Sequence, residues 1–154
     1  MALSLDVPIE QLVPHRGPML LVDRLLDDDA ESVRAEAVVK PSGLFHAEQG
    51  MPAWTGIELM AQTIAAWAGV QRLKTGNTVK LGFLLGSRRY EVTQPFFPVG
   101  SRLVIEARQE LVAENGLAVF DCRIVLDGHV VATAHLNVFQ PDDVEQYLKG
   151  AQHG

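Results

Sequence analysis

The segment "PAWTGIELMAQTIAAWAGVQRL", residues 52–73, constrains the fold most, because it is the only long helical candidate in the chain. Its proline sits at the usual first-turn position, and "KTGN" ends the pattern. A helix that is apolar almost all round is buried on every side. One curved sheet covers such a helix only in part, so the pattern predicts a further layer, and we expect a dimer. The apolar positions are Ile57, Leu59, Met60, Ile64, Ala65, Ala66, Trp67, Ala68 and Val70.

The rest of the chain has the patterns of strands. Residues 32–39 alternate apolar and polar side chains, which predicts a strand with one buried face, and residues 19–26 are apolar enough for another. After the helix come four strand-like runs, "KLGFLLGSRRYEVTQ", "SRLVIEARQELVA", "LAVFDCRIVLD" and "HVVATAHLNVF". "PFFPVG" separates the first two, and "ENG" and "DG" are hairpin signals. Residues 141–148 predict a short terminal helix. This order predicts an α+β fold, an antiparallel sheet with one helix packed on one face.

Composition excludes several classes of protein. A length of 154 residues suits a single domain over residues 1–154. The net charge of −6 argues against nucleic-acid binding. No apolar run is long enough to span a membrane, and "MALSLDVPIE" lacks the pattern of a secretory signal, so we expect a cytoplasmic protein. The single cysteine, Cys122, excludes an internal disulfide and is expected to pack in a strand.

Metal binding is not predicted, because none of the five histidines has zinc-type spacing to a second ligand. His15 lies between two prolines and is interpreted as part of a structural turn. His129, His135 and His153 are interpreted as edge or surface residues. Nucleophile-turn, phosphate-loop and dinucleotide motifs are absent from the sequence as well.

Glu58 and Gln62 interrupt the otherwise apolar helix, and their spacing of four places them on one face. A charge in apolar surroundings is costly, so it has either a partner or a function. Two interpretations stay open. Glu58 forms a structural ion pair with a strand arginine such as Arg88 or Arg89, or it is a partly desolvated carboxyl that keeps a proton and acts as a general acid.

The loop before the helix supplies a candidate base. "GLFHAEQGMPA" places His46 twelve residues before Glu58, and histidine is the side chain best suited to take a proton near neutral pH. A lone loop histidine is more often a surface residue, but this loop leads directly into the helix that carries the carboxylate. The first backbone N–H groups of a helix, near Ala53 and Trp54, have no partner within the helix and are predicted to stabilise an oxyanion. Base, acid and oxyanion donor together predict enolate chemistry beside a carbonyl.

Three motifs, in order, carry a family resemblance over roughly residues 10–140. "VPHRGPMLLVDRLLD" resembles the "PHR-x-P-x-LL-x-DR" signature of bacterial 3-hydroxyacyl-(acyl carrier protein) dehydratases of the FabZ type. "MPAWTGIELMAQTIA" resembles their "FPG-x-x-x-x-E-x-MAQ" helix, and "GFLLGSRRYEVTQPFFPVGSRL" is similar to the following strand and "P-x-x-PGD-x-L" turn. The amino-acid sequence around the helix, "HAEQGMPAW-x-GIE-x-MAQTIAAW", is most similar to the dehydratase branch of aryl polyene biosynthesis.

The resemblance implies a hot-dog fold, in which a sheet wraps one helix and two subunits join their sheets. It implies that a histidine and a glutamate from different subunits remove water from a (3R)-3-hydroxyacyl thioester without a cofactor. By position the glutamate is Glu58, its supporting amide is Gln62, and the oxyanion glycine falls on Ala53. The loop is two residues shorter here than the family pattern, and His46 is the histidine that it offers as the base.

The resemblance also implies a tunnel for the acyl chain and a carrier protein that delivers the substrate on phosphopantetheine. Tunnel candidates, each of which is equally compatible with core packing, are Phe45, Met51, Trp54, Leu59, Met60, Phe83 and Leu85. The carrier protein of this family is acidic, so docking requires a local basic patch. Its main candidates are Arg88 and Arg89, with residues 72–74, Lys80 and Arg102 as weaker ones.

Two other functions fit a hot-dog chain. A thioesterase hydrolyses the acyl thioester, often with a helix carboxylate and no essential histidine, so the pairing of His46 with Glu58 favours dehydration. The altered loop is also compatible with a non-catalytic subunit that completes a heterodimer with an active relative. The sequence therefore predicts a dehydratase that forms a homodimer, or a heterodimer with a related hot-dog subunit.

Overall fold

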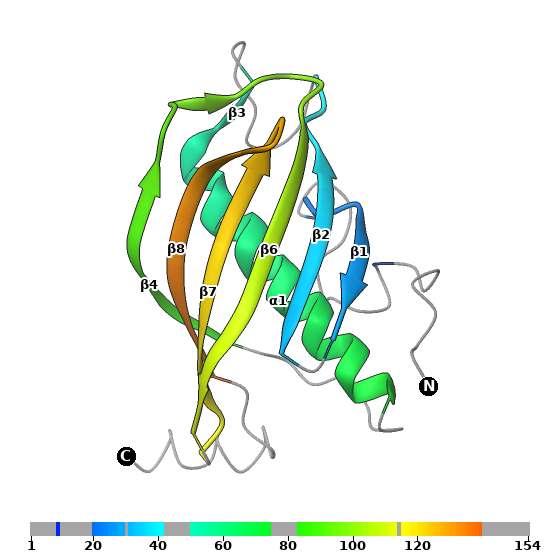
Figure 1. The fold of residues 1–154 in the computed structure, drawn as a ribbon, viewed down its shortest axis with the longest axis vertical. Coiled ribbons are helices and arrows are strands. Elements are labelled where there is room, and N and C mark those ends of the chain that lie inside the picture. Colours follow the sequence, from blue (N-terminus) through cyan, green and yellow to red (C-terminus); the bar gives the residue numbers. More distant parts are fainter. Residues whose placement is uncertain are drawn as a thin grey trace.

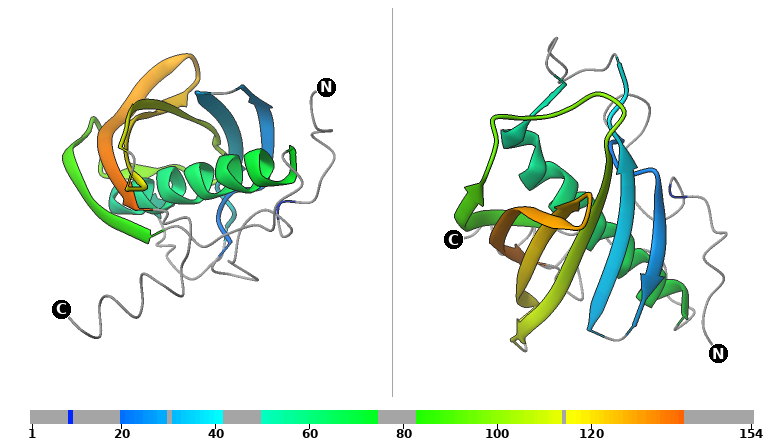
Figure 2. Two further views of the ribbon diagram at one scale, coloured as in Figure 1. Left: turned by 90° about the horizontal axis from the view of Figure 1, so that it is seen from below. Right: turned by 45° about the horizontal axis from the view of Figure 1, so that its top comes forward.

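The protein folds as one long helix against a curved antiparallel sheet (Figure 1). The computed structural model describes residues 9, 20–29, 31–41, 50–74, 83–113 and 115–139. The helix, α1 (Gly56–Lys74), crosses one face of the sheet, and the strands curve around it (Figure 2). This arrangement confirms the predicted α+β class.

Six strands form the large sheet in the order β1-β2-β6-β7-β8-β4, with every neighbouring pair antiparallel. A second, two-stranded sheet pairs β3 with β5. At the β7–β8 hairpin, Asp127 and Gly128 both have positive φ (50° and 79°), as the "DG" signal predicts. The strands are β1 (Arg24–Asp28), β2 (Ser32–Val38), β3 (Met51–Pro52), β4 (Phe83–Val92), β5 (Phe96–Phe97), β6 (Arg102–Val112), β7 (Leu117–Leu126) and β8 (His129–Phe139).

Three boundaries differ from the sequence-based expectation. The first strand begins at Arg24, and the backbone N–H groups of Leu21 and Val22 before it bond instead to Gln62 of the helix. The helix is preceded by a 3-10 turn, η3 (Ala53–Thr55), so that Pro52 ends a strand rather than starting the helix. The connection "PFFPVG" contains the short strand β5. The terminal helix predicted over residues 141–148 lies outside the described residues.

The core lies between α1 and the inner face of the sheet. Trp67 of α1 meets Phe120 of β7 edge to face, with ring centroids 5.6 Å apart, and its indole N–H donates to the Asp29 carbonyl oxygen at 2.9 Å. Cys122 is fully buried in the same core, which confirms its packing role, and burial raises the pKa of its thiol. Fully buried side chains from the strands include Ala35, Leu103, Ile105, Ile124 and Leu136.

The face of α1 that turns away from the sheet is apolar and only partly covered. Ile57, Ala61, Ala65 and Ala68 are half-buried there and pack against the edge of the core. Among the described residues, the sheet covers one side of α1, and the further layer that would cover the other side stays a prediction. Among the described residues, no helix has the length and apolar character needed to cross a membrane.

Candidate active site

The chain enters α1 through a tightly fixed turn. Pairing of Met51 with Phe97 and of Pro52 with Phe96 joins this turn to β5. Gly50, immediately before it, has φ +123°, and a Cβ at this position would overlap the Phe97 carbonyl oxygen. Gly50 therefore fixes the start of the turn that leads into α1. His46 and Phe45 lie among residues 42–49, outside the described residues, so their assigned roles stay predictions.

Gln62 ties α1 to the segment that precedes β1. Its side chain is fully buried, and its Oε1 accepts hydrogen bonds from the backbone N–H of Leu21 at 2.8 Å and of Val22 at 3.3 Å. Its Nε2 donates to Oε1 of Glu58 at 3.1 Å. The amide therefore bridges a backbone segment and the half-buried carboxyl of Glu58, one helical turn before it.

The backbone donors fix the orientation of this amide. The atom that faces the N–H groups of Leu21 and Val22 has to be the oxygen, because the reversed amide would set donor against donor. The NH₂ group of Gln62 consequently faces Glu58, and Glu58 Oε1 accepts a hydrogen bond. This hydrogen bond holds the carboxyl in one orientation, and the role of Glu58 as a general acid stays a prediction.

The alternative role of Glu58, a structural ion pair with Arg88, does not fit the sheet. Arg88 on β4 pairs directly with His135 on β8. Neighbouring residues of β8, Ala134 and Leu136, are buried in the core, so His135 and its cross-strand partner lie on the face away from α1. Arg89 has φ +53°, and both arginine side chains are exposed.

One donor of the expected oxyanion site has a partner outside the helix. The N–H of Ala53, predicted to lack a partner within the helix, donates to the Pro95 carbonyl oxygen at 2.9 Å. The prediction used helix geometry alone, and the partner comes from the turn before β5, a contact that sequence spacing does not show. The Ala53 N–H therefore already has a hydrogen-bond acceptor within the protein.

Tyr90 is a residue of this region that the sequence did not single out. Its hydroxyl donates to the carbonyl oxygen of Ala53, and its ring packs beside Gly56 at the start of α1. Burial raises the pKa of Tyr90 to about 12. The residue sits on β4, 37 positions from Ala53 along the chain, so only the fold brings the two together.

The predicted tunnel residues divide into three groups. Met51, Leu59 and Met60 are buried within the core cluster. Trp54 is 60% exposed in the single chain, so it borders the outside of the turn. Phe83 and Leu85 belong to β4, but their side chains, like Phe45, lie outside the described part of the structure.

Some of the predicted docking cations have intramolecular partners. Arg102 pairs with Glu36, and Lys74 pairs with Asp28 at 2.6 Å. Arg88 and Arg89 are exposed on β4, at the edge of the sheet. These two arginines therefore stay the stronger candidates for contact with an acidic partner.

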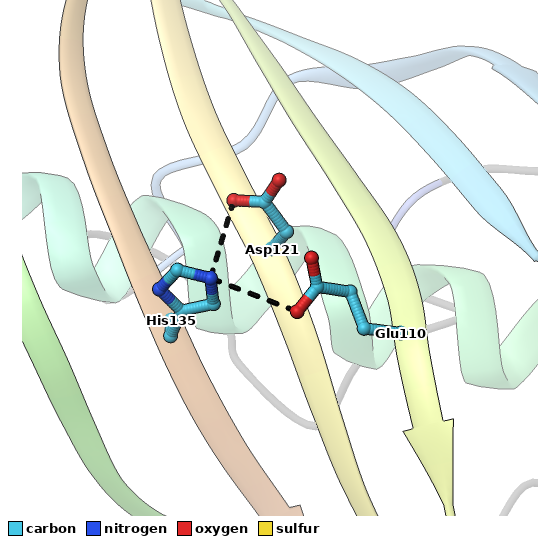
Figure 3. Close-up of side chains that lie close together, drawn as sticks. All are labelled: Glu110, Asp121 and His135. Carbon is cyan, nitrogen blue, oxygen red and sulfur yellow. Dashed lines mark ion pairs between the residues drawn. The ribbon is translucent and has the colours of Figure 1, made fainter.

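Three potential metal ligands gather on the outer face of the sheet, although sequence spacing predicted none. Nε2 of His135 lies 3.6 Å from Glu110 Oε2 and 3.9 Å from Asp121 Oδ1 (Figure 3). They come from β8, β6 and β7, so spacing along the chain does not reveal them. All three side chains are substantially exposed, and exposed groups of this kind interact only weakly. The cluster lies on the face of the sheet opposite α1, the helix that carries Glu58.

Comparison with known proteins identifies the family of this chain. The family model described as ApeP-like, ApeP dehydratase, matches residues 7–149. A 3-hydroxyacyl-(acyl-carrier-protein) dehydratase FabZ from Streptococcus equi subsp. zooepidemicus is 34% identical over 135 residues, which cover 83% of this chain and 91% of that protein.

Solved structures agree with this placement. The dehydratase heterocomplex ApeI:P from Xenorhabdus doucetiae contains a chain that is 31% identical, with a TM-score of 0.83 and coverage of 92% of this chain and 96% of that chain. The PaaI protein of E. coli, at 16% identity and a TM-score of 0.59 with coverage of 75% and 80%, shares the fold alone. The curved sheet around one helix is a hot-dog fold, and the chain belongs to the ApeP-like family of FabZ-type dehydratases.

Proposed function

We propose that the protein removes water from (3R)-3-hydroxyacyl thioesters carried by an acyl carrier protein, giving trans-2-enoyl thioesters for fatty acid or polyene-type biosynthesis. Family membership supports the reaction type. The observation that carries the proposal is the Gln62 bridge, which fixes the orientation of the Glu58 carboxyl on α1. We place this reaction in the cytoplasm.

In the proposed mechanism His46 takes a proton from C2 of the acyl chain. The electrons of that C–H bond form the C2–C3 double bond, and the hydroxyl on C3 leaves as water after it receives a proton from Glu58. The η3 turn supplies the donor that stabilises the thioester oxygen. Ala53 serves as that donor only if its hydrogen bond to Pro95 opens. The elimination needs only an acid and a base, so no cofactor takes part.

The active unit is proposed to be a dimer, because His46 and Glu58 would come from different subunits. Strand β4 forms one edge of the large sheet and β1 forms the other. Because β4 has ten residues and β1 only five, β4 offers the longer edge for pairing with a second hot-dog subunit. The partner is a second copy or a related chain. The related structure from Xenorhabdus doucetiae is a heterocomplex, which favours a related chain as the partner. A subunit that supports catalysis in its partner is the second candidate function.

The test is hydration of a crotonyl thioester, measured with the purified protein alone and with its hot-dog partner. His46→Ala and Glu58→Gln should each lower the rate by about 10²–10⁴-fold while the dimer stays intact. Glu110→Gln, the same chemical change on the opposite face of the sheet, is the matched control and should be neutral. Wild-type rates in both site variants would end the catalytic proposal.

Mass analysis of the products separates dehydration from hydrolysis. A dehydratase interconverts the 3-hydroxyacyl and enoyl thioesters, whereas a thioesterase releases a free acid. If the site variants stay active in a complex whose partner carries its own intact histidine and glutamate, the chain acts as a supporting subunit. Carrier-bound and short thioester substrates should be compared in the same assay.

A further inference from the structure

Tyr90 reaches the start of α1 because β4 is irregular there. Arg88 pairs with His135 and Glu91 with Thr133, so three steps along β4 match two steps along β8. Two residues, Arg89 and Tyr90, therefore stand opposite the buried Ala134. Without this bulge Tyr90, two residues beyond the outward-facing Arg88, would also face outward. The φ of +53° at Arg89 is the local backbone change that produces the bulge.

The hydroxyl of Tyr90 fixes the turn that begins the helix. It donates to the carbonyl oxygen of Ala53, which also accepts the backbone N–H of Gly56, while the N–H of Ala53 donates to Pro95. Both polar groups of Ala53 are thus engaged, and its carbonyl oxygen has two donors. Since the hydroxyl stays protonated far above neutral pH, it is a permanent donor to this carbonyl.

Gly56 is matched to this tyrosine by shape. Its backbone angles, φ −57° and ψ −34°, suit any residue, so conformation does not require glycine here. A Cβ at position 56 would instead overlap the Tyr90 hydroxyl and lie 3.1 Å from Ile124 Cδ1 and 3.2 Å from the Tyr90 ring carbon Cζ. The hydroxyl of Tyr90 is therefore the main reason for glycine at this position.

We infer that Tyr90 is a positioning residue for the proposed dehydration, which orients the β3–α1 turn and thereby sets where α1 presents Glu58. This inference rests on the proposed function. Glu58 lies two residues after Gly56, and it is held from the other direction by Gln62. Tyr90 on one side and Gln62 on the other define the direction of its carboxyl. Small displacements of a proton donor cost rate without necessarily changing substrate affinity.

The first test compares Tyr90→Phe with Thr63→Val in the intact dimer or heterocomplex. Both changes remove one hydroxyl that donates to a carbonyl, since Thr63 Oγ1 donates to Leu59 O within α1 at 2.8 Å. For crotonyl hydration, Tyr90→Phe should lower kcat about tenfold with KM unchanged. Thr63→Val should keep the wild-type kcat even if its Tm falls. Equal kcat values for Tyr90→Phe and the wild type would overturn the inference.

A second test separates positioning from packing. Gly56→Ala should lower both Tm and kcat, because the added methyl overlaps the Tyr90 hydroxyl. In Gly56→Ala/Tyr90→Phe the overlap with the hydroxyl is removed but the hydrogen bond is not restored, and the contacts with Ile124 Cδ1 and with Cζ of residue 90 stay close. The double variant should therefore recover part of the Tm while its kcat stays at the Tyr90→Phe level. Recovery of both quantities would assign Tyr90 a packing role only and refute the inference.

Failure of the proposed function gives a different result. If the wild-type protein and its complex do not hydrate the crotonyl thioester, the proposed function is rejected, and the inference about Tyr90 is rejected with it. If Glu58→Gln is inactive while Tyr90→Phe is fully active, the function stands and only the role of Tyr90 is rejected.

Discussion

Replacing Gln62 by methionine should destabilise the protein in a way that its contacts specify. Methionine has nearly the same length and shape, so the core stays filled. The change removes the acceptor of two buried backbone N–H groups, those of Leu21 and Val22. An unsatisfied buried polar group costs about 1–3 kcal/mol, and the bond to Val22 is the longer of the two. The free energy of unfolding should therefore fall by about 2–4 kcal/mol.

For a domain of this size, 1 kcal/mol corresponds to about 2–4 °C in Tm, so the Tm should fall by roughly 5–15 °C. Thermal unfolding followed by circular dichroism measures this loss. The comparison has to be made at equal protein concentration, because dissociation of a dimer is coupled to unfolding. Hydration activity of Gln62→Met should also fall, because Glu58 loses the donor that orients it.

Gln62→Glu is the informative control for this prediction. It keeps an oxygen toward the two backbone donors but sets a second carboxyl against Glu58, about where the amide nitrogen stands at 3.1 Å. Two carboxylates so close do not both ionise, so the folded state binds a proton that the unfolded state releases above about pH 4–5. Stability of this variant should be near wild type in mild acid and fall as the pH rises. A Tm of Gln62→Met within about 2 °C of wild type would refute the role assigned to the bridge.

Three further predictions follow from the described contacts. Glu36 has a pKa below its ordinary value of 4.5, mainly because Arg24 donates a hydrogen bond to its carboxylate. Glu36→Gln should therefore lower the free energy of unfolding by about 1 kcal/mol at pH 7. Urea titrations should show this difference vanishing as the pH falls through the pKa of Glu36 in the folded protein, and a constant difference would contradict the prediction. Buried Cys122, whose thiol pKa is raised, should resist an aromatic disulfide reagent until the protein unfolds, and fast reaction of the folded protein would contradict its packing. Arg88→Glu and Arg89→Glu should raise KM for carrier-bound substrate severalfold but not for a short thioester, and equal effects on both substrates would exclude docking at β4.

The sequence predicted the main elements because their signals are local. The apolar run after Pro52 and the alternation in residues 32–39 are direct consequences of helix and strand periods. The spacing of Glu58 and Gln62 was also readable, because helical geometry alone places residues four apart on one face.

The parts that sequence analysis missed depend on contacts between distant segments. The partner of the Ala53 N–H is a carbonyl near β5, a strand of only two residues with no periodic signal. The inward direction of Tyr90 depends on a bulge that defeats simple alternation. The outer-face group around His135 unites three strands. The role of His46 stays a prediction, since that residue lies outside the described structure.

The close fit between Gly56 and Tyr90 makes these two positions evolutionarily interdependent. A lineage that enlarges the residue at position 56 first meets a steric barrier, whereas one that first loses the phenolic oxygen removes the main overlap with alanine there. Homologous chains should therefore show correlated substitution, with bulk at one site accompanied by a smaller side chain at the other. The order in which the two changes accumulate would then be constrained, so that the tyrosine is lost before the glycine is replaced.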